Sequence, residues 1–166
     1  FEIDQSKNIQ FNDKYNSLKT EIIKNKRTLL IGEPGSGKSW FLTNFIEYLK
    51  VNSKKVIRHY CFTDTEDKDI EKRISSDVFF GNLVFDILKE FPQLKELKDK
   101  LFVSNLDELN LLLSYIDEEL IIIIDGLDHI SRVLKNLFTL SEDKTKIIEY
   151  ISQIVAPTNV YIVLGS

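Results

Sequence analysis

The chain has 166 residues, of which 43% are hydrophobic and 29% charged, and its net charge is -4. This length and composition favour one globular domain with its own core, and the acidic balance argues against direct binding to the phosphate backbone of nucleic acids. No apolar run approaches the roughly 18 residues that a membrane-spanning helix needs and no signal peptide is recognisable, so we expect a cytoplasmic protein without a membrane contact.

Strand and helix signals alternate along the chain. After a lead-in at residues 1–10, apolar residues at helical spacing predict a helix from Asn12 or Asp13 to about Asn25, with Asn12 as a candidate cap. Further helices are expected at about 38–50, 76–90, 106–118 and 142–155, and strands at 27–31, 55–62, 120–124 and 159–164. This alternation predicts an α/β fold with a parallel sheet.

The segments between these elements are less regular. Residues 63–72 form an acidic connection, either a solvated connector or a loop near a ligand. We expect a helical turn at 94–100, an extended piece at 101–103 and a loop with a short helix at 125–140. Asn105 or Ser104 is a candidate cap for the helix that begins at 106.

The most specific motif is a glycine-rich segment between the first strand and the following helix. It reads Gly32-Glu33-Pro34-Gly35-Ser36-Gly37-Lys38-Ser39 and fits the Walker A pattern of phosphate-binding loops. Its backbone N–H groups and the positive end of the helix suit a polyphosphate. We expect Lys38 to reach the β- and γ-phosphates and Ser39 to ligate Mg²⁺, and we include Trp40, the next residue, among the nucleotide-binding positions.

A second motif supplies the acid that such a loop requires. The apolar run 120–124 ends in Asp125, which is the Walker B arrangement and predicts a second Mg²⁺ ligand at the carboxyl edge of the sheet. Asp128 is a candidate catalytic base or water-orienting residue, although it can equally cap the turn. Lys38, Asp125 and Asp128 are therefore the candidate catalytic residues, with ATP and Mg²⁺ as cofactors.

The remaining chemistry-bearing residues have simpler interpretations. Cys61 cannot form an internal disulfide because the chain has no other cysteine, and it is expected to be a buried core residue in a reducing compartment. His59 is expected to pack within its strand, and His129 to be a neutral loop residue. The chain contains no methionine and ends in what reads as a buried strand, so we expect a domain of a longer protein.

Together, the two phosphate-site motifs resemble those of the STAND class of signal-transducing P-loop ATPases, in particular its NACHT-like branch. In that branch a small residue follows the Mg²⁺-binding Asp and acidic residues follow two to three places later. Gly126 and Asp128 match this pattern, whereas His129 departs from it. Residues 56–62, Val-Ile-Arg-His-Tyr-Cys-Phe, and 81–83, Gly-Asn-Leu, are also similar to bacterial antiviral sensors of the AVAST type.

The resemblance implies a P-loop NTPase core of the ASCE type at residues 27–166, preceded by a lead-in and N-terminal helix at 1–26. In such a core the terminal strand lies between the Walker A and Walker B strands, and here the core would be truncated before its last strand and lid. The family uses ATP and ADP binding to control oligomerisation, usually of identical subunits, after a trigger protein is sensed outside this domain. Two alternatives stay open: an AAA+-like ATPase acting on nucleic acid, and a nucleotide-binding scaffold that does not hydrolyse ATP.

Overall fold

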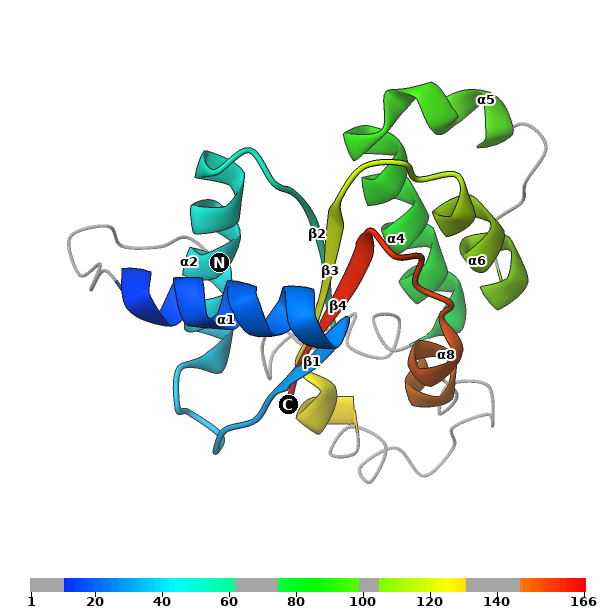
Figure 1. Cartoon of the computed structure of the whole chain (residues 1–166). Coiled ribbons are helices and arrows are strands. Elements are labelled where there is room, and N and C mark those ends of the chain that lie inside the picture. Colours follow the sequence, from blue (N-terminus) through cyan, green and yellow to red (C-terminus); the bar gives the residue numbers. More distant parts are fainter. Residues whose placement is uncertain (1–10, 62–74, 99–104, 131–146) are drawn as a thin grey trace, which may run out of the picture.

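Parallel strands form one sheet at the centre of the described chain (Figure 1). The structure, a computed structural model, describes residues 11–61, 75–98, 105–130 and 147–166. The strands are β1 (Arg27–Leu30), β2 (Lys55–Tyr60), β3 (Leu120–Asp125) and β4 (Val160–Gly165). They are ordered β1-β4-β3-β2. The α/β class and the parallel sheet are confirmed, and so is the insertion of the terminal strand between β1 and β3.

Helices cover both faces of this sheet (Figure 1). One face carries α1 (Asn12–Asn25) and α2 (Lys38–Val51). The other carries α4 (Ser76–Glu90), α6 (Leu106–Ser114) and α8 (Ile147–Gln153), and a short η2 (Pro92–Leu94) and α5 (Lys95–Lys98) follow α4. None of the helices in the described ranges is long and apolar enough to cross a membrane.

Strand β3 shows why the sheet needs a continuous apolar sequence. All of its residues are buried. Ile121 and Ile123 join the cluster under α1 and α2, whereas Ile122 and Ile124 join the cluster under α4, α6 and α8. Because successive side chains of a strand point to opposite faces, a strand covered on both sides is apolar along its length, as β3 is up to Asp125 at its carboxyl end.

Aromatic side chains attach α1 to α2. Tyr15 of α1 is buried, and its ring centroid lies 5.2 Å from that of Phe41 and 5.8 Å from that of Phe45. Phe11, immediately before α1, extends this group toward the start of α2. Phe41 itself is only partly buried and packs at the margin of that cluster.

Some predicted boundaries are wrong by a few residues. The helix predicted to reach 118 ends at Ser114, because Tyr115 and Ile116 donate to carbonyls three residues back and form a tighter turn. Asn159 Nδ2 then donates to the Ile116 and Glu118 carbonyls at 2.8 and 2.7 Å. These carbonyls therefore have a side-chain partner in place of a helical N–H group. Strand β2 ends at Tyr60, before the predicted end at 62.

The predicted caps had different outcomes. Asn105 is the cap of α6, since its Oδ1 accepts from the Glu108 amide at 3.0 Å. Asn12 is not the cap of α1, because it is already helical and Phe11 occupies the cap position without a side-chain bond. The predictions for 1–10, 63–72, 101–103, 131–140 and the start of the last helix at 142–146 lie outside the described residues.

Candidate functional site

The glycine-rich loop leaves the carboxyl end of β1 and leads directly into α2. Gly35 and Gly37 have φ angles of 79° and 87°, in the left-handed region that glycine adopts without steric cost. Ser36 donates its amide to the Glu33 carbonyl at 3.0 Å, which closes a turn inside the loop. The loop is therefore compact, and most of its residues are exposed.

The side chain of Lys38 lies back across this loop. Its Nζ donates to the carbonyl of Gly32 and, at 3.0 Å, to that of Glu33. A Cβ atom at position 32 would stand 2.8 Å from Ser36 Oγ and 3.2 Å from Lys38 Cδ, so a larger residue there would displace the lysine. The loop thus holds a cation against its own backbone, on the side where β1 ends.

The first turn of α2 supplies N–H donors next to that cation. The first bond of the helix runs from the Phe41 amide to the Gly37 carbonyl at 2.8 Å. The amides of Lys38, Ser39 and Trp40 precede it and have no acceptor within the helix. Together with the helix dipole and the Lys38 ammonium, these amides suit an anion with several oxygens, such as a polyphosphate.

Trp40 makes a contact with the N-terminal helix region. Its side chain is half-buried, and its ring lies edge-to-face against that of Phe11 at a centroid distance of 6.0 Å. This position in the first turn of α2 connects the loop to α1. Glu33 and Pro34, by contrast, are exposed.

Asp125 lies at the carboxyl end of β3 and is only 2% exposed. Between it and the loop runs the end of β4, which is bonded to β1 and to Gly32: Ser166 donates to the Leu30 carbonyl at 3.0 Å and accepts from the Gly32 amide at 3.2 Å. A Cβ atom at Gly165 would lie 2.6 Å from Asp125 Oδ1. The missing side chain at Gly165 therefore makes room for the carboxylate.

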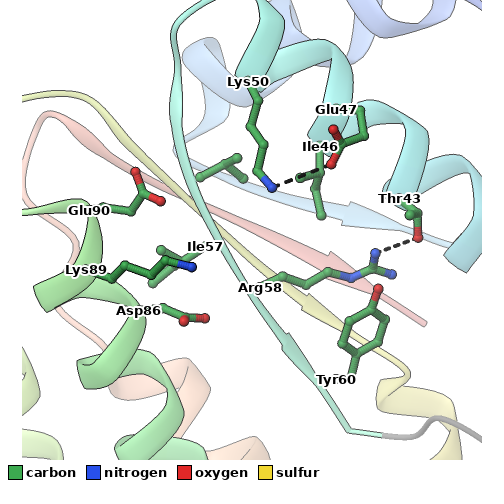
Figure 2. A pocket seen from close by; sticks show the side chains of 11 residues that line it. Thr43, Ile46, Glu47, Lys50, Ile57, Arg58, Tyr60, Asp86, Lys89 and Glu90 are labelled. Atoms are coloured by element: carbon green, nitrogen blue, oxygen red, sulfur yellow. Dashed lines mark hydrogen bonds and ion pairs between the residues drawn. The ribbon is translucent and has the colours of Figure 1, made fainter. Parts of the chain in front are cut away.

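Arg58 connects Asp125 with α2. Its Nη2 donates to Asp125 Oδ2 and lies 3.4 Å from the Ser39 carbonyl, while Nη1 donates to Thr43 Oγ1 at 2.6 Å. Figure 2 shows the guanidinium directed toward Thr43. One nitrogen atom of Arg58 thus contacts both residues predicted to bind Mg²⁺: Asp125 through its carboxylate and Ser39 through its backbone carbonyl.

The sequence did not single out Arg58 as a site residue. A positive charge in the middle of an otherwise half-apolar strand was the available signal, because such a residue must find a partner when the strand is covered. The identity of that partner depends on the pairing of β2 with β3, which places Tyr60 opposite Asp125. That register cannot be read from the local sequence.

Asp128 lies in a helical turn at 127–130 that follows Gly126, whose φ is 84°. About a quarter of its side chain is exposed, and its Oδ2 lies 3.8 Å from His129 Nε2. The His129 amide donates to the Gly126 carbonyl at 3.1 Å, as expected for a turn directly after the strand. The role of Asp128 as a base stays a prediction.

His59 and Cys61 are both buried, as the sequence predicted. His59 packs edge-to-face against Phe79 of α4 at a centroid distance of 5.0 Å. The Cys61 amide donates to the Asp125 carbonyl at 2.9 Å. Burial and, to a lesser extent, the charge of Asp125 raise the pKa of the Cys61 thiol to about 12, so the thiol stays protonated at neutral pH.

The donor set at this edge of the sheet fits magnesium better than a transition metal. Within the described residues no group of three or more His, Cys, Asp and Glu side chains converges on one point, so a zinc-type cage is absent there. A hydroxyl from Ser39 and a carboxylate from Asp125 are hard oxygen ligands, and Mg²⁺ typically takes one or two such ligands together with phosphate oxygens and waters. The carboxylate already has a cationic partner in Arg58.

One family model matches nearly the whole chain. It is described as "Nephrocystin 3, N-terminal" and covers residues 7–164. No curated protein has a significant sequence match to the chain. The matched residues include the loop, the whole of β1, β2 and β3, and β4 except for its last residue, Gly165.

Proposed function

The chain belongs to the family of nephrocystin 3 N-terminal domains, and from that premise we propose that it is an ATP-binding switch domain of the STAND class that hydrolyses ATP slowly. The observation that carries this proposal is that one Arg58 nitrogen donates to the Asp125 carboxylate and lies 3.4 Å from the backbone carbonyl of Ser39, so the acid at the end of β3 lies next to the first turn of α2. The Asp125 carboxylate therefore lies beside the helix that begins at the glycine-rich loop, and a bound Mg²⁺–triphosphate requires this combination of a phosphate-binding loop and an acid.

Each residue has a distinct task in this proposal. The amides at the start of α2 and the Lys38 ammonium bind the phosphate oxygens, and Lys38 exchanges its carbonyl partners in the loop for them. Ser39 Oγ and Asp125 would hold Mg²⁺, which would supply positive charge to neutralise the triphosphate. Asp128 orients or deprotonates the attacking water.

We further propose that this switch domain belongs to a signalling protein of the NACHT-like branch. ATP and ADP would stabilise different arrangements of this domain with the rest of the protein, because the γ-phosphate and Mg²⁺ contact the two arrangements differently. The expected consequence is nucleotide-controlled assembly of identical subunits after a trigger protein is sensed, in a cytoplasmic and bacterial antiviral context. The resemblance of residues 56–62 and 81–83 to antiviral sensors supports that context.

Nucleotide binding is tested with a fluorescent, non-hydrolysable ATP analogue titrated onto the full-length protein in Mg²⁺. Lys38→Ala should weaken binding about tenfold or more, because hydrogen bonds from a charged donor contribute roughly 1.5–3 kcal/mol. Lys50→Ala is the matched control, since Lys50 lies at the far end of the same helix and forms an exposed ion pair with Glu47. Equal affinities for wild type and Lys38→Ala would contradict the site assignment.

Hydrolysis is tested separately, by single-turnover cleavage of bound ATP. Asp128→Ala should slow cleavage by roughly 10²–10⁴-fold, the usual contribution of a general base, while leaving affinity unchanged. Asp117→Ala, at an exposed acid that precedes β3, controls for loss of a carboxylate. If Asp128→Ala cleaved ATP at the wild-type rate, Asp128 would not have this role. If the wild-type protein bound ATP normally but did not cleave it, the scaffold alternative would be favoured.

A further inference from the structure

We propose that Arg58 is a positioning residue of the magnesium site: it holds the Asp125 carboxylate and the first turn of α2 in the arrangement that a bound Mg²⁺ requires. This inference rests on the proposed function, because it assigns a role within that site. It adds a residue that lies outside both phosphate-site motifs, on a strand that contributes no ligand.

The first support is that Arg58 joins three elements of the fold. It originates from β2, its Nη2 donates to Asp125 at the end of β3, and its Nη1 donates to Thr43 of α2. Thr43 Oγ1 in turn donates to the Ser39 carbonyl at 2.6 Å. The guanidinium is therefore bonded directly to the Asp125 carboxylate and, through the Thr43 hydroxyl, to the backbone of Ser39.

The second support is the way in which the two oxygens of Asp125 are used. Oδ2 accepts from Arg58, whereas Oδ1 lies against the backbone of Gly165 and accepts no hydrogen bond from any residue in the described ranges. Arg58 thus fixes the carboxylate through one oxygen and leaves the other for a cation or its water. Removing a partner of this kind, which orients a ligand without touching the metal, commonly changes metal affinity by roughly 10- to 100-fold. We therefore expect an effect of about tenfold or more at this site.

The third support is the direction that the guanidinium takes. Arg58 lines a cavity of about 250 Å³ between α2, β2 and α4, together with the carboxylates of Glu47, Asp86 and Glu90. Figure 2 shows its head group turned away from Asp86 and Glu90 and toward Thr43. The charge is therefore directed to the site, although other acids line the same cavity.

The fourth support is that the Arg58 side chain is held in place by its surroundings, at a cost in free energy. The Arg58 side chain is 8% exposed, its Cζ lies 3.7 Å from the centroid of the Tyr60 ring, and its buried Nε has no hydrogen-bond partner in the described part of the chain. A buried ion pair with an unsatisfied donor is weak evidence for stability alone, since apolar replacements are often at least as stable. A role in holding the ligands accounts for its presence.

The experiment measures how strongly Mg²⁺ increases nucleotide affinity in the full-length protein. A fluorescent non-hydrolysable ATP analogue is titrated in Mg²⁺ and in EDTA, and the ratio of the two affinities is compared between variants. Arg58→Gln should lower this ratio by about tenfold or more and leave the affinity in EDTA within about twofold. Arg58→Lys, which keeps the charge but not the fork of donors, should recover part of the ratio.

Two further variants make the result specific. Lys55 lies at the opposite end of β2 and forms an ion pair with Glu118 at 2.6 Å. Lys55→Gln therefore also removes a cation and an ion pair from this strand, and it should leave the ratio unchanged. Thr43→Val removes the hydroxyl between Arg58 and α2 at constant shape and should lower the ratio in the same direction. If Arg58→Gln does not fold, as judged by circular dichroism, Arg58→Lys and Thr43→Val decide the question.

The outcomes separate this inference from the proposed function. Wild-type ratios in all folded Arg58 and Thr43 variants, with Lys38→Ala still impaired, would overturn the inference and leave the function standing. An equal fall of affinity in Mg²⁺ and EDTA would also overturn it, because it would show a merely structural role. A wild-type protein that binds no nucleotide would overturn both.

Discussion

At the scale of single residues, Cys61 links the nucleotide site to the pH dependence of stability. Its thiol is fully buried directly after β2, and its pKa is raised to about 12 by burial and by the charge of Asp125. In the unfolded chain a thiol loses its proton near pH 9, so between these values the folded state binds more protons than the unfolded state. Stability should therefore fall as pH rises through this window, by about 1.4 kcal/mol per pH unit from this group.

This prediction is measured by urea denaturation between pH 8 and 10.5 in wild type and in Cys61→Ala. The variant has a cavity whose cost does not depend on pH, so its lower stability should show a shallower decline than wild type at alkaline pH. Parallel curves for both proteins would mean that the thiol does not cause the decline. All other side chains are the same in both proteins, so their contributions cancel in the difference.

At the scale of secondary-structure elements, α6 depends on its cap. Asn105 Oδ1 accepts from the Glu108 amide at 3.0 Å. The negative charges of Asp107 and Glu108 in the first turn also interact favourably with the positive end of the helix dipole. Asn105→Ala should lower the free energy of unfolding by about 1 kcal/mol. Thermal or urea unfolding followed by circular dichroism measures it.

Asn12 provides the matched control for this prediction. It is also an asparagine at the start of a helix, but it is exposed and already helical, and Phe11 takes the cap position. Asn12→Ala should therefore change stability by less than about 0.5 kcal/mol, as expected for a surface substitution away from special features. Equal losses in the two variants would contradict the assignment of the cap.

The two asparagines also show how far local sequence determines the ends of elements. Both satisfy the same rule for capping residues, but α1 begins one position earlier, with Phe11 at the cap position and its ring 6.4 Å from that of Tyr15. The end of α6 was missed for a similar reason, because the carbonyls released after Ser114 are bonded by Asn159, more than forty residues away in sequence. Element types follow local periodicity, whereas their ends depend on distant partners.

At the scale of the whole molecule, the parallel sheet and its strand order were predictable from the alternation of elements and from the family resemblance. The loop at Gly32–Ser39 and Asp125 were predictable because each is a local motif at the end of a strand. Arg58 was not, because its partner is specified by the register of β2 against β3 and by the turn of α2 that carries Thr43. A residue whose role comes only from tertiary neighbours leaves little local pattern.

The glycine at the end of β4 has a consequence for how sequence variation in this family can be understood. A side chain at position 165 would collide with the Asp125 carboxylate and with Leu42, whereas one at Gly81 of α4 would meet nothing within 4 Å. In a saturation-mutagenesis library selected for nucleotide binding, position 165 should therefore be as intolerant as a ligand, although it contributes no ligand atom. Sequence variation at position 165 should therefore be restricted as strongly as at a catalytic residue. The physical reason is that the Asp125 carboxylate occupies the space that a side chain at position 165 would need.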